Sequence, residues 1–518
     1  MVTPRPVAAS VPGVVGSPTT RPVRPPRLSV AELAEWLGTH VAVRVLGEGR
    51  TEVTGLCLGS ARVQPGDLYV ALPGSRAHGA AFAADAVAAG AVAVLTDPEG
   101  VALASVDVPV LEVDRPRRVL GELSAHLYGD PAGALRMIGV TGTQGKTTTT
   151  RLAEAALQAS GTTAGVIGTV GTRVAGQDVA TSLTTPEAPD LQALLAVMRE
   201  RGVEACAMEV SSHALVMGRV DGLVFDVATF LNLGRDHLDF HADLEEYFAA
   251  KASLFTPERT RRALVNVDDE HGRRLAESVE VPVRTFSASG AAADWRAVDV
   301  ETSARGSTFT VVGPGGERFA AGFPLPGGFN VANALAAVAS CAEAGLDAGA
   351  VAGAMAQGPG VPGRLEPVDE GQAFTVVVDY AHKPDAVEAA LATLRPLTSG
   401  RVLVVIGAGG DRDPGKRPVM GGIAAAHADV VVVTDDNPRS EDPAAVRAAV
   451  LSGVPDDARA EVLEVGDRRL AIREALRRAR PGDIVLVAGK GHESGQEVGG
   501  VVHPFDDRTV VREELTAL

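Results

Sequence analysis

A short glycine-containing loop has the residue types that hold the phosphates of a nucleotide. It reads Gly142, Thr143, Gln144, Gly145, Lys146, Thr147 and Thr148. Glycines let the backbone approach phosphate closely, and a helix that starts at the loop would offer free N–H groups and partial positive charge. Lys146 would bridge the outer phosphates, and the Thr147 hydroxyl could meet Mg²⁺. Position 140 is valine, which makes the spacing shorter than the usual Walker pattern, so a plain strand–helix connector is the alternative.

A carboxylate and an imidazole follow two predicted strands further along the chain. Glu209 comes directly after a strand that ends at Met208, and His237 lies in the run Gly234-Arg235-Asp236-His237-Leu238-Asp239. Either residue alone is more often a surface or capping residue. Their placement after successive strands, near a phosphate loop, favours a site for a divalent cation.

Other polar residues of this region have less specific signals. Lys251 ends the helical segment Glu245 to Lys251 and, by itself, is typical of a solvated helix lysine. Asn266, Asp268 and Asp269 follow another predicted strand. They would contact adenine or ribose, or they would cap a helix, and the sequence leaves both interpretations open.

The elements around these residues alternate between strands and helices. A buried strand is expected at 137–140 and a helix at 147–160, with Gly161 as its C-terminal stop. Further apolar strands are expected at 205–208, 227–230 and 263–267, with helical stretches between several of them. This alternation predicts a parallel sheet covered by helices on both faces.

A third part of the chain, from about Gly360, repeats the pattern. Nearly continuous β-branched strands are expected at 375–378, 402–406, 430–433 and 484–487, as in doubly buried parallel sheets. Polar, glycine-containing loops follow them, with the sequences DYAHKPD, GAGGDRDPGKR, TDDNPRSEDP and AGKGHE. Because ligands bind outside the carboxyl ends of strands in open α/β sheets, these loops predict a second binding site.

The N-terminal part is predicted to be a small α/β unit after a disordered tail. Ser29 precedes a segment typical of a capped helix, and residues 52–73 read as short strands around the turn Pro65-Gly66-Asp67. An alanine-rich helix over 80–92 and a strand at 91–95 follow. The first 27 residues contain seven prolines, which favours disorder. We therefore predict an α/β protein with a tail at 1–27 and domains at 28–134, 135–358 and 359–518.

Composition excludes several functional classes. The chain has 518 residues, 46% of them hydrophobic, which at about 150 residues a domain suggests three domains. The formal charge of −17 argues against a nucleic-acid binder. Three widely spaced cysteines indicate a reducing compartment, and no apolar run is long enough to span a membrane. Pro12-Gly13 interrupts any signal-peptide core, so a cytoplasmic location is expected.

Together these motifs resemble the Mur ligase superfamily over roughly residues 52–512. The resemblance implies three domains: one for UDP, a central P-loop ATPase with a parallel sheet, and a Rossmann-like domain for an incoming amino acid. It is strongest with members that add diaminopimelate to UDP-N-acetylmuramoyl-L-alanyl-D-glutamate. It therefore implies an ATP- and Mg²⁺-dependent ligase of peptidoglycan synthesis that acts as a monomer on small molecules.

The resemblance also assigns roles to individual residues. ATP contacts are implied for the phosphate loop, Asn266 and Asp269, and metal contacts for Thr147, Glu209 and His237. Lys251 matches a lysine that becomes N-carboxylated, which requires a neutral amine and hence a pKa below its usual value of about 10.4. Contacts to the UDP-muramoyl-dipeptide are implied for Leu58, Ser60, Ser75, Arg76, Ala77, Thr184, Thr185, Ser211 and Arg219. The diaminopimelate contacts are Arg412, Asp436, Asn437, Pro438, Arg439, Gly489 and Glu493.

The Asp436-to-Arg439 run is the most specific of these signals, because superfamily members that use lysine depart from it. Arg439 can hold a carboxylate through two parallel hydrogen bonds, and diaminopimelate differs from lysine by one carboxylate. The implied reaction phosphorylates the D-glutamyl γ-carboxylate with ATP, and an amine of meso-diaminopimelate then attacks the acyl phosphate. Closure of the third domain would bring the substrates together.

Five glycine, alanine or methionine residues depart from the superfamily pattern, and they keep two rival hypotheses open. One rival is a related amide ligase, either lysine-adding or similar to folylpolyglutamate synthetase. The other is a nucleotide-binding protein without turnover. The phosphate loop, the candidate metal ligands and the Asp436-to-Arg439 run are all intact, which favours the ligase. The departing positions are Gly59, Ala61, Met217, Gly234 and Gly328.

Overall fold

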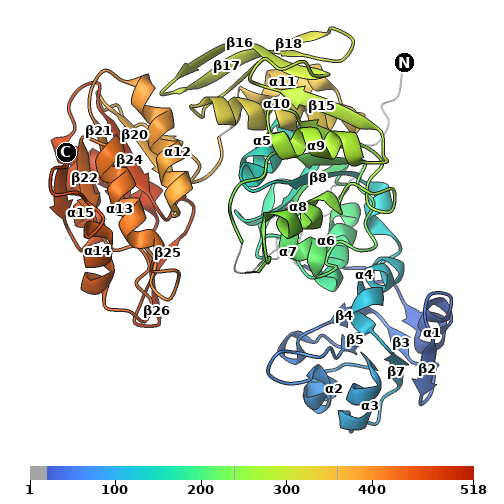
Figure 1. Ribbon diagram of the computed structural model, residues 1–518. Helices are drawn as coiled ribbons and strands as arrows, with labels where there is room; N and C mark the ends of the chain where they lie inside the picture. The colour runs from blue at the N-terminus through green and yellow to red at the C-terminus, as the bar shows by residue number, and fades with distance from the viewer. Residues whose placement is uncertain (1–19, 182, 238–239, 357, 359) are drawn as a thin grey trace, which may run out of the picture.

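A computed structural model describes residues 20–181, 183–237, 240–356, 358 and 360–518. The chain forms three α/β domains in a row, with the N-terminal and C-terminal domains on either side of a larger central one (Figure 1). In the described residues, each domain is built on its own sheet, of five, eleven and six strands respectively. The predicted fold class is therefore confirmed. The predicted boundaries after residues 134 and 358 lie in the connections before β8 and before β19, and they stay predictions.

The N-terminal domain has a mostly parallel sheet with the strand order β2-β7-β6-β5-β4. Ser29 caps the first helix as predicted, in a capping box with Glu32. The expected helix over 80–92 is wrong in its extent. His78 caps a short 3-10 turn at its start, and Gly90, with φ of 114°, ends the helix early. The elements are β1 Leu28–Ser29, α1 Val30–Gly38, β2 Val43–Leu46, β3 Glu52–Val53, β4 Gly55–Cys57, β5 Asp67–Val70, α2 Ala83–Ala88, β6 Ala93–Thr96, α3 Pro98–Leu103, β7 Val110–Val113 and α4 Pro116–Leu127.

The central sheet has parallel strands in its middle and antiparallel strands at both ends. Its order is β11-β10-β9-β12-β8-β13-β14-β15-β16-β17-β18, and β9 to β16 run parallel. The predicted strands correspond to β8, β12, β13 and β14, and the predicted helix corresponds to α5. The elements are β8 Arg136–Thr141, α5 Lys146–Ala159, β9 Ala164–Ile167, β10 Thr172–Val174, β11 Gln177–Val179, α6 Ala188–Glu200, β12 Ala205–Glu209, α7 Ser212–Val216, β13 Val227–Phe230, α8 Leu244–Ala252, β14 Ala263–Asn266, α9 Glu270–Ser278, β15 Val283–Ser287, β16 Trp295–Ser303, β17 Gly306–Val312, β18 Arg318–Phe323, α10 Gly328–Glu343 and α11 Ala348–Met355.

The C-terminal sheet has the order β19-β20-β24-β21-β22-β23, parallel except for the edge strand β19. The predicted strands 402–406 and 430–433 coincide with β21 and β22, because valine-rich runs buried on both faces have sharp polar boundaries. The elements are β19 Glu366–Val368, β20 Thr375–Asp379, α12 Pro384–Leu394, β21 Val402–Ile406, α13 Lys416–His427, β22 Val430–Val433, α14 Pro443–Leu451, β23 Glu461–Glu464, α15 Arg468–Arg478, β24 Ile484–Ala488, β25 Gly495–Val498, β26 Val501–Pro504 and α16 Asp507–Thr516.

Helix α6 joins the first two domains through a shared core. Its Ala188, Ala193 and Ala196 pack in the same buried cluster as Leu56 and Tyr128 of the N-terminal domain. Alanines allow α4 and α6 to approach closely, and burying this apolar surface favours one fixed arrangement of the two domains.

Residues 20–27, which the sequence assigned to a disordered tail, are described and contact both of these domains. Residues 1–19 lie outside the described residues. Across the described part of the chain, no helix is both long and apolar enough to cross a membrane. Cys57, Cys206 and Cys341 are buried free thiols.

The C-terminal domain contains a buried ion pair between its last two helices. Arg468 of α15 donates to Asp507 of α16 over 2.7 and 2.8 Å, and both side chains are fully buried. Arg468 also donates to the carbonyl of Ala488, so the pair fixes α15 and α16 against the end of β24.

We expect Asp507→Ala to lower the free energy of unfolding by about 3–5 kcal/mol, because it leaves a buried guanidinium without its counterion. Urea denaturation measures the loss. The matched control is Glu513→Ala, which breaks the more exposed pair between Arg469 and Glu513 on the same two helices and should cost less than about 1 kcal/mol. Equal effects of the two substitutions would contradict this reasoning.

Candidate active site

The phosphate loop lies between β8 and α5 and is held by an asparagine from the neighbouring strand end. The side chain of Asn232 accepts from the amide of Gln144 at 2.9 Å and donates to the Gln144 carbonyl at 3.2 Å. Gly145 has φ of 87°, and a Cβ there would lie 2.3 Å from Asn333 Oδ1. Glycine is therefore required at the start of α5. Asn232 was not among the site residues predicted from the sequence. Its position two residues after β13 is the sequence feature that could have identified it.

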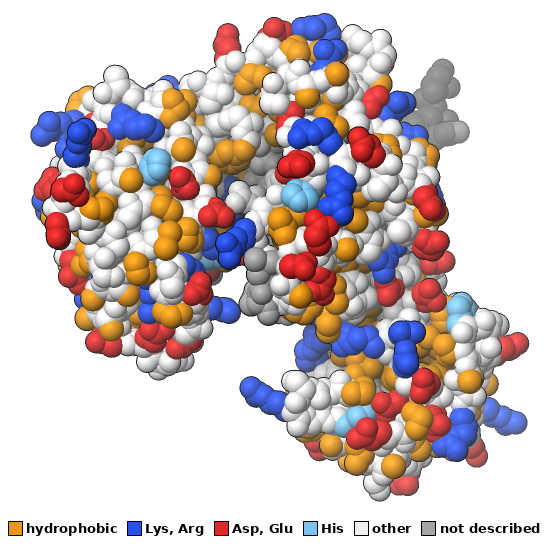
Figure 2. All heavy atoms as spheres, viewed as in Figure 1, with side chains coloured by type: hydrophobic (Ala, Val, Ile, Leu, Met, Phe, Trp, Pro, Cys, Tyr) orange, Lys and Arg blue, Asp and Glu red, His pale blue; other side chains and the backbone are white. Residues whose placement is uncertain are grey.

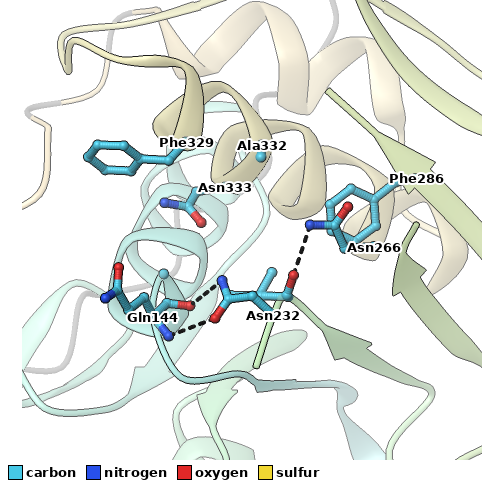
Figure 3. Close-up of a pocket in the computed structure, with 9 residues that line it drawn as sticks. Gln144, Asn232, Asn266, Phe286, Phe329, Ala332 and Asn333 are labelled. Atoms are coloured by element: carbon cyan, nitrogen blue, oxygen red, sulfur yellow. Dashed lines mark hydrogen bonds between the residues drawn. The ribbon is translucent and has the colours of Figure 1, made fainter. Parts of the chain in front are cut away.

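A hollow lies beside this loop, and Figure 3 shows its lining residues. Asn266, whose side chain donates to the Leu231 carbonyl at 2.8 Å, lies on one side, and Phe329 on the other, with 46% of its surface exposed. An aromatic face next to amide groups suits a flat, hydrogen-bonding ring. The lining residues are Gln144, Gly145, Leu231, Asn232, Asn266, Phe286, Phe329, Ala332 and Asn333.

Asn266 and Asp269, for which the sequence left ligand contact and helix capping both open, differ in the structure. Asn266 faces the hollow. Asp269 caps α9 by accepting from the Gly272 amide, and its other oxygen accepts from the Leu233 amide at 3.2 Å. Asn266 therefore lines the hollow beside the phosphate loop, whereas both carboxylate oxygens of Asp269 accept from backbone amides.

Glu209 ends β12 with its carboxylate fully buried and oriented by the loop after β9. The Thr169 amide donates to one oxygen at 2.8 Å, and the Thr169 hydroxyl donates to the other at 3.2 Å. A Cβ on Gly168 would lie 2.3 Å from the carboxylate. Arg151 of α5 fixes the same loop through the Val170 and Gly171 carbonyls. The phosphate-loop helix therefore helps to position Glu209.

His237 follows β13 in a left-handed conformation, with φ of 54°. Its Nε2 lies 3.5 Å from Asp236 Oδ2, and its ring meets that of His213 edge-on, with centroids 4.8 Å apart. Partial burial lowers the pKa of His237 to about 4. The imidazole is therefore neutral at physiological pH, which is the form that binds a metal.

Lys251 is buried, contrary to the expectation for an isolated helix lysine. Only 1% of its surface is exposed, and its Nζ donates to the Gly142 carbonyl at 2.9 Å and lies 4.4 Å from the centroid of the Tyr247 ring. Lys146 reaches the same carbonyl at 2.7 Å. Burial, and secondarily the charge of Lys146, hold the pKa of Lys251 well below its usual value. The amine is therefore closer to the neutral form that reacts with CO₂.

The donors fit a magnesium ion only in combination with groups from outside the protein. Within the described ranges, no group of three or more His, Cys, Asp or Glu side chains is arranged to hold a metal ion. Mg²⁺ is usually bound by one or two carboxylates together with substrate phosphates and water. Glu209 supplies one buried carboxylate at the phosphate loop, and N-carboxylation of Lys251 would add a second, so the residues fit that mode.

The predicted muramoyl-peptide contacts gather at the end of β12, beside Glu209. Thr184 and Thr169 share a hydroxyl–hydroxyl bond of 3.0 Å, and the Thr185 hydroxyl donates to the Glu209 carbonyl at 2.8 Å. Ser211 caps α7, and its amide donates to Thr185 at 3.3 Å. Arg219 donates to the Thr185 carbonyl at 3.4 Å. These four residues therefore lie together and adjoin the candidate metal ligand.

In the N-terminal domain, the predicted UDP contacts come from two loops on adjacent strands. Leu58 and Ser60 follow β4, and the exposed residues Ser75, Arg76 and Ala77 follow β5, its parallel neighbour. Because the carboxyl ends of parallel strands lie at one edge of a sheet, both loops are on the same edge.

The predicted diaminopimelate contacts divide into a buried network and a more accessible pair. Asn437 donates to Glu493 at 2.8 Å, and Lys490 contacts Asn437, Glu493 and Asp436 at 3.0, 3.3 and 3.5 Å. Gly489, with φ of 119°, comes directly before Lys490. Lys490 is fully buried. It was not among the predicted site residues, although it lies within the AGKGHE loop that the sequence assigned to a binding site.

Arg439 and Arg412 lie outside this network. Arg439, after Pro438, has φ of 53°, donates to the Gly410 carbonyl and lies 3.5 Å from Glu497. Arg412 is exposed. The structure therefore brings Asp436, Asn437, Gly489 and Glu493 together, and a carboxylate would compete with the present partners of Arg439.

One ion pair connects the C-terminal and central domains next to the phosphate loop. Lys383, directly before α12, donates to Asp236 at 2.7 Å, next to His237. Figure 2 shows Lys and Arg side chains gathered at both junctions between domains. This contact was also missed, because the sequence does not show which domain surfaces meet.

The three glycines that depart from the superfamily pattern have room beside them for a larger side chain. A Cβ on Gly328 would meet no atom within 4 Å, and a Cβ on Gly59 or Gly234 would meet only ordinary contacts at 3.5 and 3.8 Å. Glycine is therefore not required by packing at these positions. Ala61 lies in an exposed turn, and the carbonyl of Met217 accepts from Arg117 at 3.4 Å.

Comparison with known proteins covers all three domains. Residues 52–128 match the Mur ligase family catalytic domain, residues 140–341 the Mur ligase middle domain, and residues 363–491 the Mur ligase glutamate ligase domain. The chain is 56% identical to UDP-N-acetylmuramoyl-L-alanyl-D-glutamate--2,6-diaminopimelate ligase of Streptomyces coelicolor, covering 96% of this chain and 98% of the relative. It is 51% identical to the protein of that name from Corynebacterium glutamicum, covering 92% and 95%. A solved structure of that name has a TM-score of 0.67 and 34% identity, covering 95% of this chain and 99% of the other.

We expect Lys251 to carry a carbamate. In ¹³C-bicarbonate, the wild-type protein should give a carbamate resonance that is absent from Lys251→Ala and retained by the matched control Lys416→Ala. The reason is the buried, less basic amine of Lys251, which adds to CO₂ with release of one proton. Identical spectra for wild type and Lys251→Ala would contradict the prediction.

Proposed function

We propose a specific reaction for this chain, which belongs to the Mur ligase family. In this proposal, the protein is an ATP-dependent ligase that adds diaminopimelate, as the meso isomer, to UDP-N-acetylmuramoyl-L-alanyl-D-glutamate in peptidoglycan synthesis. The observation that carries the proposal is the convergence of two sets of residues at the ends of β8, β12 and β13. The candidate peptide contact Thr185 bonds to Glu209, which pairs with Val140 on β8 just before the phosphate loop. The chain is also more than 50% identical to ligases of that name over more than 90% of its length.

The first step transfers the γ-phosphoryl group of ATP to the D-glutamyl γ-carboxylate and releases ADP. The Lys146 amine donates to the Gly142 and Thr143 carbonyls at 2.7 and 3.1 Å, within the loop that would hold the phosphates. Its positive charge would neutralise charge that develops on the transferred group. Mg²⁺, held by Thr147, Glu209, His237 and carboxylated Lys251 together with phosphate oxygens, would supply further positive charge.

The second step is attack of a diaminopimelate amine on the acyl phosphate, which forms the amide and releases phosphate. We assign the distal carboxylate of diaminopimelate to Arg439, with Asp436, Asn437 and Glu493 around its ammonium group. Arg439 is only partly buried, and its present partners are a carbonyl and a carboxylate at 3.5 Å, so a substrate carboxylate has access to it.

Domain closure completes the site in this proposal. The pair of Lys383 and Asp236 already holds the C-terminal domain beside the phosphate loop. Because ion pairs with exposed side chains are weak and exchangeable, Lys383 can move between Asp236 and substrate phosphate as the domains close. We also propose that the enzyme acts as a monomer, and its small anionic substrates support a cytoplasmic location.

Phosphate release with ATP, Mg²⁺ and UDP-muramoyl-dipeptide tests the proposal, with meso-diaminopimelate and L-lysine compared as acceptors. Turnover with diaminopimelate alone supports it. A preference for lysine would keep the ligase but overturn the assignment of Arg439. Absence of turnover with either acceptor, from protein that binds ATP, would favour the nucleotide-binding alternative.

We expect Lys146→Ala to lower kcat by about 10²–10³-fold, because it removes a cation from the phosphoryl transition state. The same phosphate-release assay measures the loss. The matched control is Arg136→Ala, which removes an exposed cation from the opposite end of β8 and should leave kcat within about twofold. A wild-type rate for Lys146→Ala would overturn the role of the loop.

We expect Arg439→Ala to raise the KM for diaminopimelate by about 10- to 100-fold, the effect of losing a charged hydrogen-bonded pair. The KM for ATP should change little, and discrimination against lysine should fall. Arg477→Ala, on an exposed helix surface of the same domain, is the control. Unchanged discrimination would show that another group reads the distal carboxylate.

A further inference from the structure

The segment 20–27, here called the strap, inserts an arginine into the N-terminal domain. The guanidinium of Arg21 donates to the Tyr128 hydroxyl at 2.6 Å, to the Leu56 carbonyl at 2.8 Å and to the Asp67 carboxylate at 3.1 Å. Asp67 is 2% exposed and Tyr128 is fully buried. Arg21 therefore supplies a buried carboxylate with a counterion.

The receiving strand has a glycine where the guanidinium enters. A Cβ on Gly55 would lie 2.3 Å from Arg21 Nη1 and 2.3 Å from Asp67 Oδ1. Any larger residue would therefore expel either the arginine or the carboxylate. This local shape indicates that the strap has a specific docking position and does not merely lie on the surface.

The middle of the strap is attached to the central domain. The amides of Val23 and Arg24 donate to the two carboxylate oxygens of Glu200, each at 2.8 Å, and Glu200 is the last residue of α6. The neighbouring Arg199 donates to the carbonyls of Tyr128 and Gly129 at 3.1 and 2.8 Å. The strap and Arg199 thus fix the C-terminal end of α6 to the N-terminal domain.

Ion pairs also join the opposite end of α6 to the N-terminal domain. Arg117 of the N-terminal domain donates to Glu187 at 3.2 Å, and Arg62 donates to Asp190 at 3.1 Å. Glu187 also accepts from Arg219, one of the proposed substrate contacts, at 2.8 Å. A shift of the N-terminal domain about α6 would therefore be felt at the peptide site.

The strap also supports the strand that leads into the proposed UDP contacts. Strand β4 is at the edge of its sheet, with β5 as its sheet partner. Arg21 donates a hydrogen bond to the Leu56 carbonyl of this strand. After the strap, β1 pairs with β3, just before β4. Leu58 and Ser60 follow β4 directly. The segment 20–29 therefore lies along residues 52–57 and sets where the next residues project.

We propose that Arg21 is a positioning residue for the UDP-linked substrate. It fixes β4, and hence the loop at Leu58 and Ser60, relative to the peptide contacts at the N-terminal end of α6. This inference rests on the proposed function, because the ligand has to reach from the N-terminal domain to the phosphate loop. Fixing both halves of its site before binding lowers the entropy lost on binding.

Steady-state kinetics of full-length variants test the inference. Arg21→Ala should raise the KM for UDP-muramoyl-dipeptide about tenfold, with kcat and the KM for ATP within about twofold, since uniform binding is lost and the chemical step is not. Arg21→Lys, which keeps the charge, should recover part of the loss. Tyr128→Phe removes one partner of Arg21 without leaving a buried charge and should show a smaller change in the same direction. The control is Arg24→Ala, because only the backbone amide of Arg24 contacts Glu200.

Hydrogen exchange separates failure of this inference from failure of the proposed function. The amides of residues 55–60 should exchange faster in Arg21→Ala than in wild type or Arg24→Ala, with or without turnover. Unchanged exchange there, or an unchanged KM for the UDP-linked substrate in folded Arg21→Ala, would overturn the inference. Parallel changes in kcat and every KM would also overturn it, because they would indicate a general structural role. A wild-type protein that does not bind the UDP-linked substrate would instead overturn the proposed function.

Discussion

Repulsion between negative groups is the constraint that the rest of this structure has to meet. The proposed reaction gathers phosphates and carboxylates at one point, and two like charges 4 Å apart repel by about 4 kcal/mol at an effective dielectric constant of 20. The chain itself carries a formal charge of −17. Positive charge therefore has to be concentrated locally. Of its 48 basic residues, five are lysines, namely Lys146, Lys251, Lys383, Lys416 and Lys490.

Each of these lysines lies at a proposed site or on the surface between sites. Two reach the Gly142 carbonyl of the phosphate loop, one pairs with Asp236, one donates to the His382 carbonyl, and one is buried among Asp436, Asn437 and Glu493. Arginine is used at other proposed substrate contacts, such as Arg219 and Arg439, and in the buried pair of Arg468 with Asp507. Lysine differs from it in being a compact charge whose pKa burial can lower, and carbamate formation at Lys251 needs that lower pKa.

The two junctions between domains have different physical characters, and this difference suits their roles. The N-terminal domain shares an apolar core with α6 and also makes charged contacts with both ends of that helix. The C-terminal domain contacts the central domain through the exchangeable pair of Lys383 and Asp236 and through Ala304, at the turn between β16 and β17, which packs against its core. Figure 1 shows the C-terminal domain set apart from the central sheet. Motion during the reaction is therefore expected at the C-terminal junction, where less apolar surface has to separate.

The sequence by itself determined the elements whose signals are local. The phosphate loop, the strands β8, β12, β21 and β22, and the cap at Ser29 could all be predicted, because glycine spacing, β-branched runs and capping residues act over a few neighbours. The tertiary structure alone decided the burial of Lys251, the position of Lys490, the clamp of Asn232 on the phosphate loop and the docking of Arg21. Each of these depends on partners distant in sequence: Lys251 meets Gly142, Asn232 meets Gln144, and Arg21 meets Asp67 and Tyr128. Proline-rich composition predicts a disordered tail that includes residues 20–27, because composition carries no information about a buried carboxylate elsewhere that requires their arginine.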